Sequence, residues 1–289
     1  MYNVKLVNKI SSNGLSRLSK ETFNCGADVA NPTALLVRSA DLHSEEFNPE
    51  LLCIARAGAG VNNIPLDRAA EAGIVVFNTP GANANAVKEL VLTGLFLSSR
   101  KIVEGIEWAK TLKDSGDEAA KLVEKGKGQF VGPELEGKTL GVIGLGAIGV
   151  LVANAAERLG MTVLGYDPYL SVDAAWSVSR SIRHCTDINE IYEKSDYITI
   201  HVPATPATNG MINAATMSIM KDGVRILNFA RADLVDSASM LDALYDGKVA
   251  AYVTDFPTDE MNAKVVTAVR AAHAAGGIPV LNIGVSSYD

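Results

Sequence analysis

The feature that most constrains this chain is a glycine-rich segment between an apolar run and a helical pattern. It reads Gly144-Leu145-Gly146-Ala147-Ile148-Gly149 and directly follows the apolar run 139–143. Helical spacing covers 147–159, and the next apolar run, 162–166, ends beside Asp167. The fingerprint of a dinucleotide-binding unit has these same parts: a strand, a Gly-x-Gly-x-x-Gly turn, a helix, and an acid after the next strand.

Each glycine of this segment has its own physical reason. Gly144 permits the tight turn, Gly146 lets the backbone approach a pyrophosphate, and Gly149 lets the helix and the strand pack closely. Phosphates are then expected at the positive end of the helix, near Ala147 and Ile148. A purely structural glycine turn is the alternative, and the strand, helix and acid at the right offsets favour binding.

The acid that follows the second strand indicates which dinucleotide binds. Asp167 can accept hydrogen bonds from both ribose hydroxyls, whereas a 2′-phosphate at that place would meet a like charge. The predicted cofactor is therefore NAD rather than NADP.

Short apolar runs alternate with helical patterns along the whole chain, which predicts parallel sheets covered by helices. The expected strands are 34–37, 51–55, 74–77, 139–143, 162–166, 197–201, 225–229 and 250–255. The expected helices are 67–72, 147–159, 214–220 and 237–245. The predicted fold is α/β, with two Rossmann-like or flavodoxin-like parallel-sheet domains.

A nearly unbroken helical pattern over 87–112 is long enough to leave one domain and enter another. We place the boundary near Ser98, which divides the chain into domains 1–97 and 98–289. The stretch 110–127 mixes charges of both signs and small residues. It is expected to be a solvated helix or loop, and an arm between subunits is the alternative.

Composition excludes several classes of protein. The net charge of −7 gives no electrostatic footprint for nucleic acid or an acidic membrane. Cys25, Cys53 and Cys185 are widely spaced and odd in number, so neither a disulfide framework nor a metal site is expected, and a reducing cytoplasm fits. We expect no signal peptide and no membrane span, because no stretch of about 18 apolar residues occurs.

Several segments together resemble one family across nearly the whole chain. They are Arg56-Ala57-Gly58-Ala59-Gly60-Val61-Asn62-Asn63, Phe77-Asn78-Thr79-Pro80, His201-Val202-Pro203 and Asn228-Phe229-Ala230-Arg231, with the glycine-rich segment. The chain thus resembles the D-isomer-specific 2-hydroxyacid dehydrogenases. The resemblance implies a substrate-binding domain near 1–97, a dinucleotide-binding domain after it, an active site in the cleft between them, and a homodimer.

Within that family, two segments most resemble the members that oxidise D-3-phosphoglycerate to 3-phosphohydroxypyruvate in serine biosynthesis. They are 35–40 and 252–257. The resemblance implies a small phosphorylated 2-hydroxy acid as substrate. Two rival functions stay open: another D-2-hydroxyacid dehydrogenase, such as a glyoxylate or hydroxypyruvate reductase, and a non-catalytic NAD-binding protein.

The resemblance also assigns catalytic roles. Arg231 stands at the family position for the guanidinium that holds the substrate carboxylate, and arginine offers a planar fork of donors for this purpose. The carboxylate partner of the general base falls on Glu260, with Asp259 as its rival. At the position of the family's histidine stands Asn282, whose amide cannot carry a proton near neutral pH. His273 is expected to be a plain helix-surface histidine.

Binding residues follow from the same resemblance. For the substrate we expect Arg38, Arg56 and Gly58, although both arginines could equally form ordinary surface ion pairs. The expected cofactor-binding residues, beyond the glycine-rich segment and Asp167, are Thr79, Val202, Pro203, Phe229, Ala230, Asp255 and Gly284.

Overall fold

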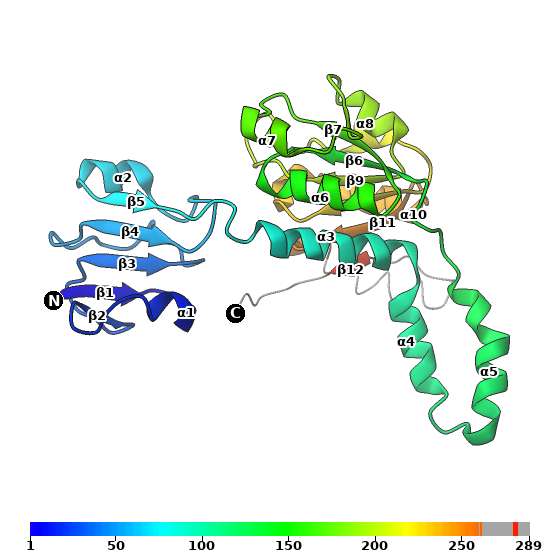
Figure 1. The fold of residues 1–289 in the computed structure, drawn as a ribbon, viewed down its shortest axis with the longest axis horizontal. Coiled ribbons are helices and arrows are strands. Elements are labelled where there is room, and N and C mark those ends of the chain that lie inside the picture. Colours follow the sequence, from blue (N-terminus) through cyan, green and yellow to red (C-terminus); the bar gives the residue numbers. More distant parts are fainter. Residues whose placement is uncertain (260, 262–279, 283–289) are drawn as a thin grey trace. The chain divides into compact units, whose positions relative to one another are not determined.

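The structure is a computed structural model that describes residues 1–259, 261 and 280–282 (Figure 1). The chain divides into two compact units, which we call unit 1, Met1–Asn83, and unit 2, which begins at Ala84. Each contains one parallel sheet with helices, as in the predicted α/β class. No helix among these residues is long and apolar enough to cross a membrane.

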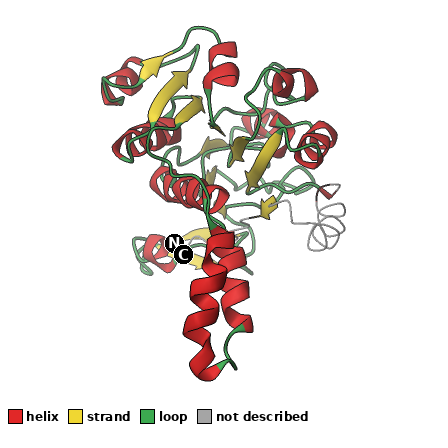
Figure 2. Ribbon diagram, turned by 90° about the vertical axis from the view of Figure 1, so that its right-hand side faces the viewer, coloured by secondary structure: helices red, strands yellow, loops and turns green. Residues whose placement is uncertain are grey.

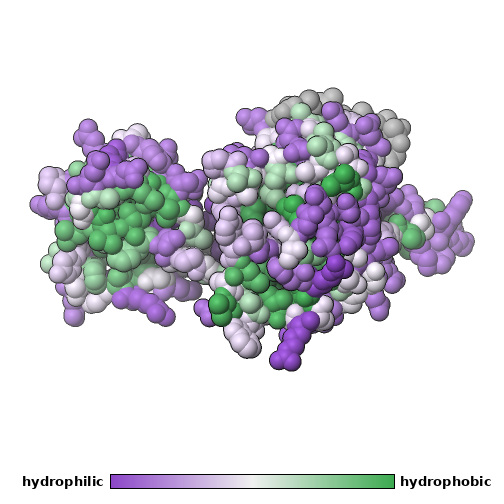
Figure 3. Space-filling model, turned by 90° about the horizontal axis from the view of Figure 1, so that it is seen from above, coloured by the Kyte–Doolittle hydropathy of each residue, from purple (hydrophilic) through white to green (hydrophobic). Residues whose placement is uncertain are grey.

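Unit 1 is built on a five-stranded parallel sheet with the order β2-β1-β3-β4-β5. The strands are β1 (Tyr2–Leu6), β2 (Phe23–Gly26), β3 (Ala34–Val37), β4 (Cys53–Arg56) and β5 (Val75–Phe77). Two short helices accompany them, α1 (Ser12–Leu15) and α2 (Leu66–Glu71). Apolar surface therefore stays open on this unit (Figure 3), and its exposed large apolar side chains include Leu52, Leu66, Val75 and Phe77.

Unit 2 holds a seven-stranded parallel sheet with the order β12-β11-β10-β9-β6-β7-β8. The strands are β6 (Thr139–Ile143), β7 (Thr162–Tyr166), β8 (Arg183–His184), β9 (Tyr197–Ile200), β10 (Val224–Asn228), β11 (Val249–Thr254) and β12 (Val280–Asn282). The order reverses direction between β6 and β9, as in doubly wound folds, and such a reversal marks the usual place of a ligand.

Helices cover both faces of this sheet and enclose a separate apolar core on each side. One core joins Leu140 and Val142 of β6 to α3 (Ala84–Ser99) and α6 (Ala147–Arg158). The other core joins the opposite face to α8 (Asn189–Lys194), α9 (Ala214–Ser218) and α10 (Ser237–Tyr245). Because both faces are buried, the central strands read as unbroken apolar runs.

The helical pattern expected over 87–112 forms two helices rather than one. α3 ends at Ser99, and α4 (Ile102–Thr111) begins three residues later. Val87, Val91 and Leu95 of α3 are buried in a core of unit 2. Because α3 packs against α6 and this sheet, the division between the units lies at the start of α3 and not near Ser98, where the sequence placed it.

A helical hairpin extends away from the body of unit 2 (Figure 2). We call it the arm, and it comprises α4, a 3-10 turn (Gly116–Glu118), α5 (Ala119–Gly126) and a second 3-10 turn (Lys127–Phe130). Among the described residues, α4 and α5 include no buried side chain. The expectation of a solvated helix over 110–127 is met by α5, whose charges form exposed ion pairs such as Lys121–Glu118.

Candidate functional site

The carboxyl edge of the sheet in unit 2 gathers most of the predicted cofactor-binding residues. The glycine-rich turn follows β6, Asp167 follows β7, and Asp255 follows β11. The segments 201–203 and 229–231 follow β9 and β10. Ligands of open parallel sheets bind at this edge, so the structure brings these residues together where a cofactor is expected, and their contact with it stays a prediction.

The three glycines of the turn differ in what surrounds them. Gly144 has a φ of +92°, in the left-handed region that favours glycine, and a Cβ there would lie 2.7 Å from the carbonyl oxygen of His201. A Cβ on Gly149 would collide with the carbonyl oxygen of Gly144. A Cβ on Gly146 would meet no atom of the described residues within 4 Å, so this position faces open space. The open side of the turn is thus the side of Gly146, where helix α6 begins.

The start of α6 is suited to an anion. Gly146 precedes the first helical residue, Ala147, and has no side chain to cap the amides of the first turn. Those amides lie at the positive end of the helix dipole, and their N–H groups point away from the helix. Ala147 is exposed and Ile148 is half-buried, so the first turn is accessible. A pyrophosphate fits this cradle.

Asp167 is tied to the turn itself. Its Oδ2 accepts a hydrogen bond of 2.8 Å from the backbone N–H of Leu145, and its Oδ1 accepts one of 2.8 Å from Tyr169. Each carboxylate oxygen can accept a second hydrogen bond, and ribose hydroxyls are suitable donors. The acid therefore both braces the turn and keeps acceptor capacity for a sugar.

His201 closes the other side of the turn. Its backbone N–H donates to the carbonyl of Ile143 at 2.7 Å, and its Nε2 lies 2.9 Å from the hydroxyl oxygen of Thr199. Burial lowers the pKa of His201 to about 4, so the ring is neutral near neutral pH. Val202, next in the chain, is half-buried and contacts Gly144, whereas Pro203 is exposed. This strand end presents a neutral, mostly apolar wall.

The loop after β10 holds the predicted catalytic arginine by means of one buried amide. The Asn228 side chain is fully buried, and its Nδ2 donates to the carbonyl of Arg231 at 2.7 Å. Its Oδ1 accepts hydrogen bonds from the backbone N–H groups of Ala230, at 3.1 Å, and Arg231, at 3.3 Å. Phe229 between them is buried, and the guanidinium of Arg231 lies 5.7 Å from the ring centroid of Phe256. The backbone of Arg231 is thus fixed from two sides.

The predicted site residues Glu260 and Gly284, and the predicted helix-surface residue His273, lie outside the described residues. Asn282 is the last residue of β12 and pairs with Thr254 of β11, so it stands at the same carboxyl edge. Asp255 directly follows β11, and its backbone N–H donates to the carbonyl of Asn228 at 3.3 Å. Met261 is buried.

Unit 1 brings together the predicted substrate-binding residues at the carboxyl edge of its own sheet. Arg38 follows β3, and Arg56 ends β4, which pairs with β3. The hydroxyl of Thr79 accepts a hydrogen bond of 2.8 Å from the backbone N–H of Gly58, and the N–H of Thr79 donates back to the carbonyl of Gly58 at 3.0 Å. In this structure Thr79 therefore braces the Gly58 loop.

Two asparagines that hold these loops were not predicted. The sequence pattern includes Asn228 only as part of a motif, and it gives no role to Asn8 of unit 1. For Asn228, the available signal was a polar residue at the end of an apolar strand. Among the described residues, no group of three His, Cys, Asp or Glu side chains is placed to hold a metal ion.

Comparisons with known proteins agree with this geometry. Residues 95–273 match the family model of the D-isomer specific 2-hydroxyacid dehydrogenase, NAD binding domain. The D-3-phosphoglycerate dehydrogenase of Methanocaldococcus jannaschii is 38% identical over 211 residues, which are 73% of this chain and 38% of that protein. The D-3-phosphoglycerate dehydrogenase of Bacillus subtilis is 34% identical over 273 residues, which are 88% of this chain and 48% of that protein. The chain thus spans less than half the length of these relatives.

A solved structure gives the same result for the fold. The D-lactate dehydrogenase from Aquifex aeolicus, complexed with NAD and lactic acid, superposes with a TM-score of 0.69 at 26% identity, covering 96% of this chain and 82% of that one. The predicted resemblance and the predicted cofactor, NAD, are confirmed. The glycine-rich turn, Asp167 and the loops around them are therefore parts of an NAD-binding domain, and this chain belongs to the D-isomer-specific 2-hydroxyacid dehydrogenase family.

Proposed function

We propose that this chain oxidises D-3-phosphoglycerate to 3-phosphohydroxypyruvate with NAD, as a step of serine biosynthesis in the cytoplasm. The observation that carries the proposal is the loop after β10, where Asn228 holds Arg231 at the same sheet edge as the NAD-binding turn. The two curated relatives named above, both D-3-phosphoglycerate dehydrogenases, support this substrate.

The proposal gives each of the chain's own residues a role in binding or in orienting the substrate. Arg231 binds the carboxylate of the acid through its planar fork and orients C2, which carries the hydride. NAD, when bound, supplies the hydride acceptor. Arg38 and Arg56 of unit 1 bind the phosphate, because two guanidinium groups on neighbouring strand ends suit a dianion. We accordingly assign substrate binding to the N-terminal domain and cofactor binding to the C-terminal one.

Removal of the hydroxyl proton should be the slow part of the reaction. Asn282 occupies the place of the family's histidine, and an amide has no proton-accepting nitrogen. Glu260 is the proposed catalytic carboxylate, but with Asn282 in that place it has no histidine to partner, so the hydroxyl proton passes to water as the hydride leaves C2. General acid–base catalysis typically contributes about 10²- to 10⁴-fold, so we expect a slow enzyme that still binds its ligands.

The experiment that tests the proposal compares substrates. Formation of NADH is followed by absorbance with D-3-phosphoglycerate, D-lactate and D-glycerate at equal concentrations. We expect the phosphorylated acid to have the highest kcat/KM. The variant Asn282→His is measured beside the wild type and should turn over faster; an increase of less than a few-fold means that our assignment of position 282 is wrong.

Two alternatives remain within reach of the same experiment. The Aquifex aeolicus D-lactate dehydrogenase, which shares the fold, favours an unphosphorylated acid as the second candidate. A preference for D-lactate or D-glycerate over D-3-phosphoglycerate would select it. A protein that binds NADH, as measured by fluorescence titration, but turns over none of the acids, also after Asn282→His, would be a non-catalytic NAD-binding relative.

We further propose that the chain forms a homodimer through the arm. Apolar side chains on α4 and α5 stay exposed in the single chain, namely Ile102, Val103, Ile106, Leu122 and Val123. Contact between Trp108 and Phe130, at 5.2 Å between ring centroids, braces the base of the hairpin. A helical hairpin with exposed apolar side chains and no buried ones is stable when a partner covers it. A second copy, whose arm carries the same surface, is the proposed partner.

A further inference from the structure

Asn8 of unit 1 holds three consecutive backbone amides with one side-chain oxygen. Its Oδ1 accepts hydrogen bonds from the N–H groups of Arg38 at 2.8 Å, Ser39 at 3.1 Å and Ala40 at 3.1 Å. Asn8 lies two residues beyond β1, and the three amides begin directly after β3, which pairs with β1. The contact therefore joins two neighbouring strand ends at the carboxyl edge of the sheet.

Three amides that converge on one oxygen leave the segment little freedom. Each hydrogen bond fixes the plane of one peptide group, so the orientations of the peptides before Arg38, Ser39 and Ala40 are all set by the same atom. Successive amides of this kind form a concave nest that prefers an oxygen ligand. The backbone from which the Arg38 side chain extends thus depends on Asn8.

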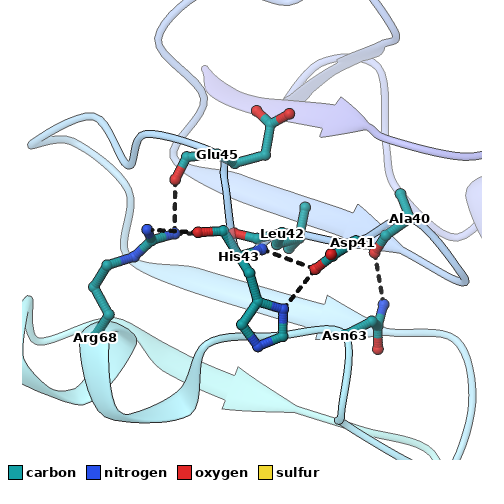
Figure 4. Close-up of polar contacts among 7 residues, drawn as sticks. All are labelled: Ala40, Asp41, Leu42, His43, Glu45, Asn63 and Arg68. Atoms are coloured by element: carbon teal, nitrogen blue, oxygen red, sulfur yellow. Dashed lines mark hydrogen bonds and ion pairs between the residues drawn. The ribbon is translucent and has the colours of Figure 1, made fainter.

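The far end of the same loop is held by different residues (Figure 4). Arg68 donates to the carbonyls of Leu42 at 2.9 Å, His43 at 2.9 Å and Glu45 at 2.7 Å. Asn63 donates to the carbonyl of Ala40 at 2.8 Å. Because these anchors act on the part of the loop beyond Ser39, removal of Asn8 should release the Arg38 end and leave the rest in place.

We propose that Asn8 is a positioning residue for the recognition of the substrate's anionic group, acting through Arg38. The inference rests on the proposed function, in which Arg38 binds the phosphate. A bidentate contact between a guanidinium and a phosphate needs its donors within about 0.5 Å of the right place. A loop that adopts several orientations therefore loses much of the binding free energy of this contact. A neutral amide also holds the loop without placing a negative charge beside an anion.

The test measures Asn8→Ala against the wild type in the full chain. Binding of D-3-phosphoglycerate is followed by calorimetry in the presence of NADH, where no net oxidation occurs, and steady-state kinetics give KM and kcat. We expect the Kd and the KM for D-3-phosphoglycerate to rise about tenfold or more, while the KM for NAD and kcat change less than about threefold. A merely structural role would instead lower the thermal midpoint and impair binding of both ligands.

Two further variants sharpen the result. Asn8→Asp keeps an oxygen that can accept the three amides but adds a negative charge beside the anion, so we expect a wild-type thermal midpoint and a Kd between those of the wild type and Asn8→Ala. Arg68→Met removes the far anchors and serves as the matched control: it should lower the thermal midpoint of unfolding and leave the Kd for D-3-phosphoglycerate unchanged. Asn8→Ser replaces Asn8→Ala if the latter does not fold.

The outcomes separate the inference from the proposed function. A wild type that binds D-3-phosphoglycerate without oxidising it refutes the proposed activity, and the Kd of Asn8→Ala still decides the role of Asn8. An Asn8→Ala variant that binds as tightly as the wild type refutes the inference alone. A wild type that does not bind the acid overturns both.

Discussion

A single methyl group on Gly146 should separate cofactor binding from stability. In Gly146→Ala the new Cβ meets no atom of the described residues within 4 Å, and the φ of −75° suits alanine. The smaller entropy of the unfolded chain favours the variant by about 0.4–1 kcal/mol, and the poorer helix cap opposes it by a similar amount. We therefore expect the free energy of unfolding to change by less than about 1 kcal/mol.

The same methyl group stands on the open side of the turn, where the pyrophosphate is expected. The cofactor must then either move away from the amides of α6 or lose hydrogen bonds to them. Hydrogen bonds to charged groups contribute about 1.5–3 kcal/mol, and 1.4 kcal/mol is a factor of ten in Kd. We expect the Kd for NADH to rise at least tenfold in Gly146→Ala.

Gly149→Ala is the matched variant, in which the main effect is expected on stability rather than on direct contact with the cofactor. Its Cβ would collide with the carbonyl oxygen of Gly144, so the turn has to move, and overpacking of this kind costs about 1–3 kcal/mol. For a unit of this size each kcal/mol lowers the thermal midpoint by about 2–4 °C. Fluorescence titration with NADH and thermal unfolding, run on both variants, measure the two effects. Wild-type affinity in Gly146→Ala, or wild-type stability in Gly149→Ala, would refute our reading of the turn.

Three more predictions follow from the described contacts. Arg231→Lys replaces a planar fork of donors with a point charge, so kcat/KM for the acid should fall about 100-fold or more, while the Kd for NADH stays within about threefold. An equally large weakening of NADH binding would contradict the role assigned to Arg231. Ile106→Glu places a charge on an arm residue that is 51% exposed, and sedimentation should show the proposed dimer shifted to monomer, whereas an unchanged mass rules the arm out. Burial lowers the pKa of His201 from 6.5 to about 4, so between these pH values only the unfolded chain is protonated at this residue. The contribution to stability is therefore fully present above about pH 6.5, and the free energy of unfolding falls by up to about 3 kcal/mol toward pH 4. Urea unfolding should show a smaller loss in His201→Gln, and an identical loss would count against the burial argument.

The central part of the NAD-binding domain could be predicted because its strands are buried on both faces. The runs 139–143 and 162–166 coincide with β6 and β7, and 147–159 exceeds α6 by one residue. By contrast, β1 and β2 were missed, since Tyr2–Leu6 and Phe23–Gly26 carry polar residues and form part of a sheet with thin helical cover. Local pattern fails where burial comes from distant segments.

The break between α3 and α4 shows a second limit. Apolar residues continue at helical spacing through Ile102 and Ile106, so the sequence reads as one helix. The first part buries its apolar stripe in unit 2, but the apolar residues of α4 stay exposed on the arm. The spacing of apolar residues predicts a helix and its apolar stripe. It does not predict which surface covers that stripe, because this depends on tertiary packing.

The candidate site divides in the same way. The glycines and Asp167 could be found because their roles depend on a short contiguous stretch and one strand end. Asn8 could not, because its three partners lie about 30 residues away in sequence and are backbone groups, which leave no trace in residue identity. Residues that hold a loop are found only when the hydrogen bonds of that loop are traced.

The bracing of the glycine-rich turn has a thermodynamic consequence. Backbone hydrogen bonds from Gly144 to Tyr166 and from His201 to Ile143, with the Asp167 carboxylate on Leu145, hold the loop before any ligand arrives. Little backbone entropy remains to be lost when the dinucleotide binds, so most of the interaction enthalpy is retained as affinity. The amides of Gly144 and Leu145, which are already hydrogen-bonded, should therefore exchange equally slowly with and without NAD. The heat capacity change of binding should reflect buried ligand surface rather than loop ordering.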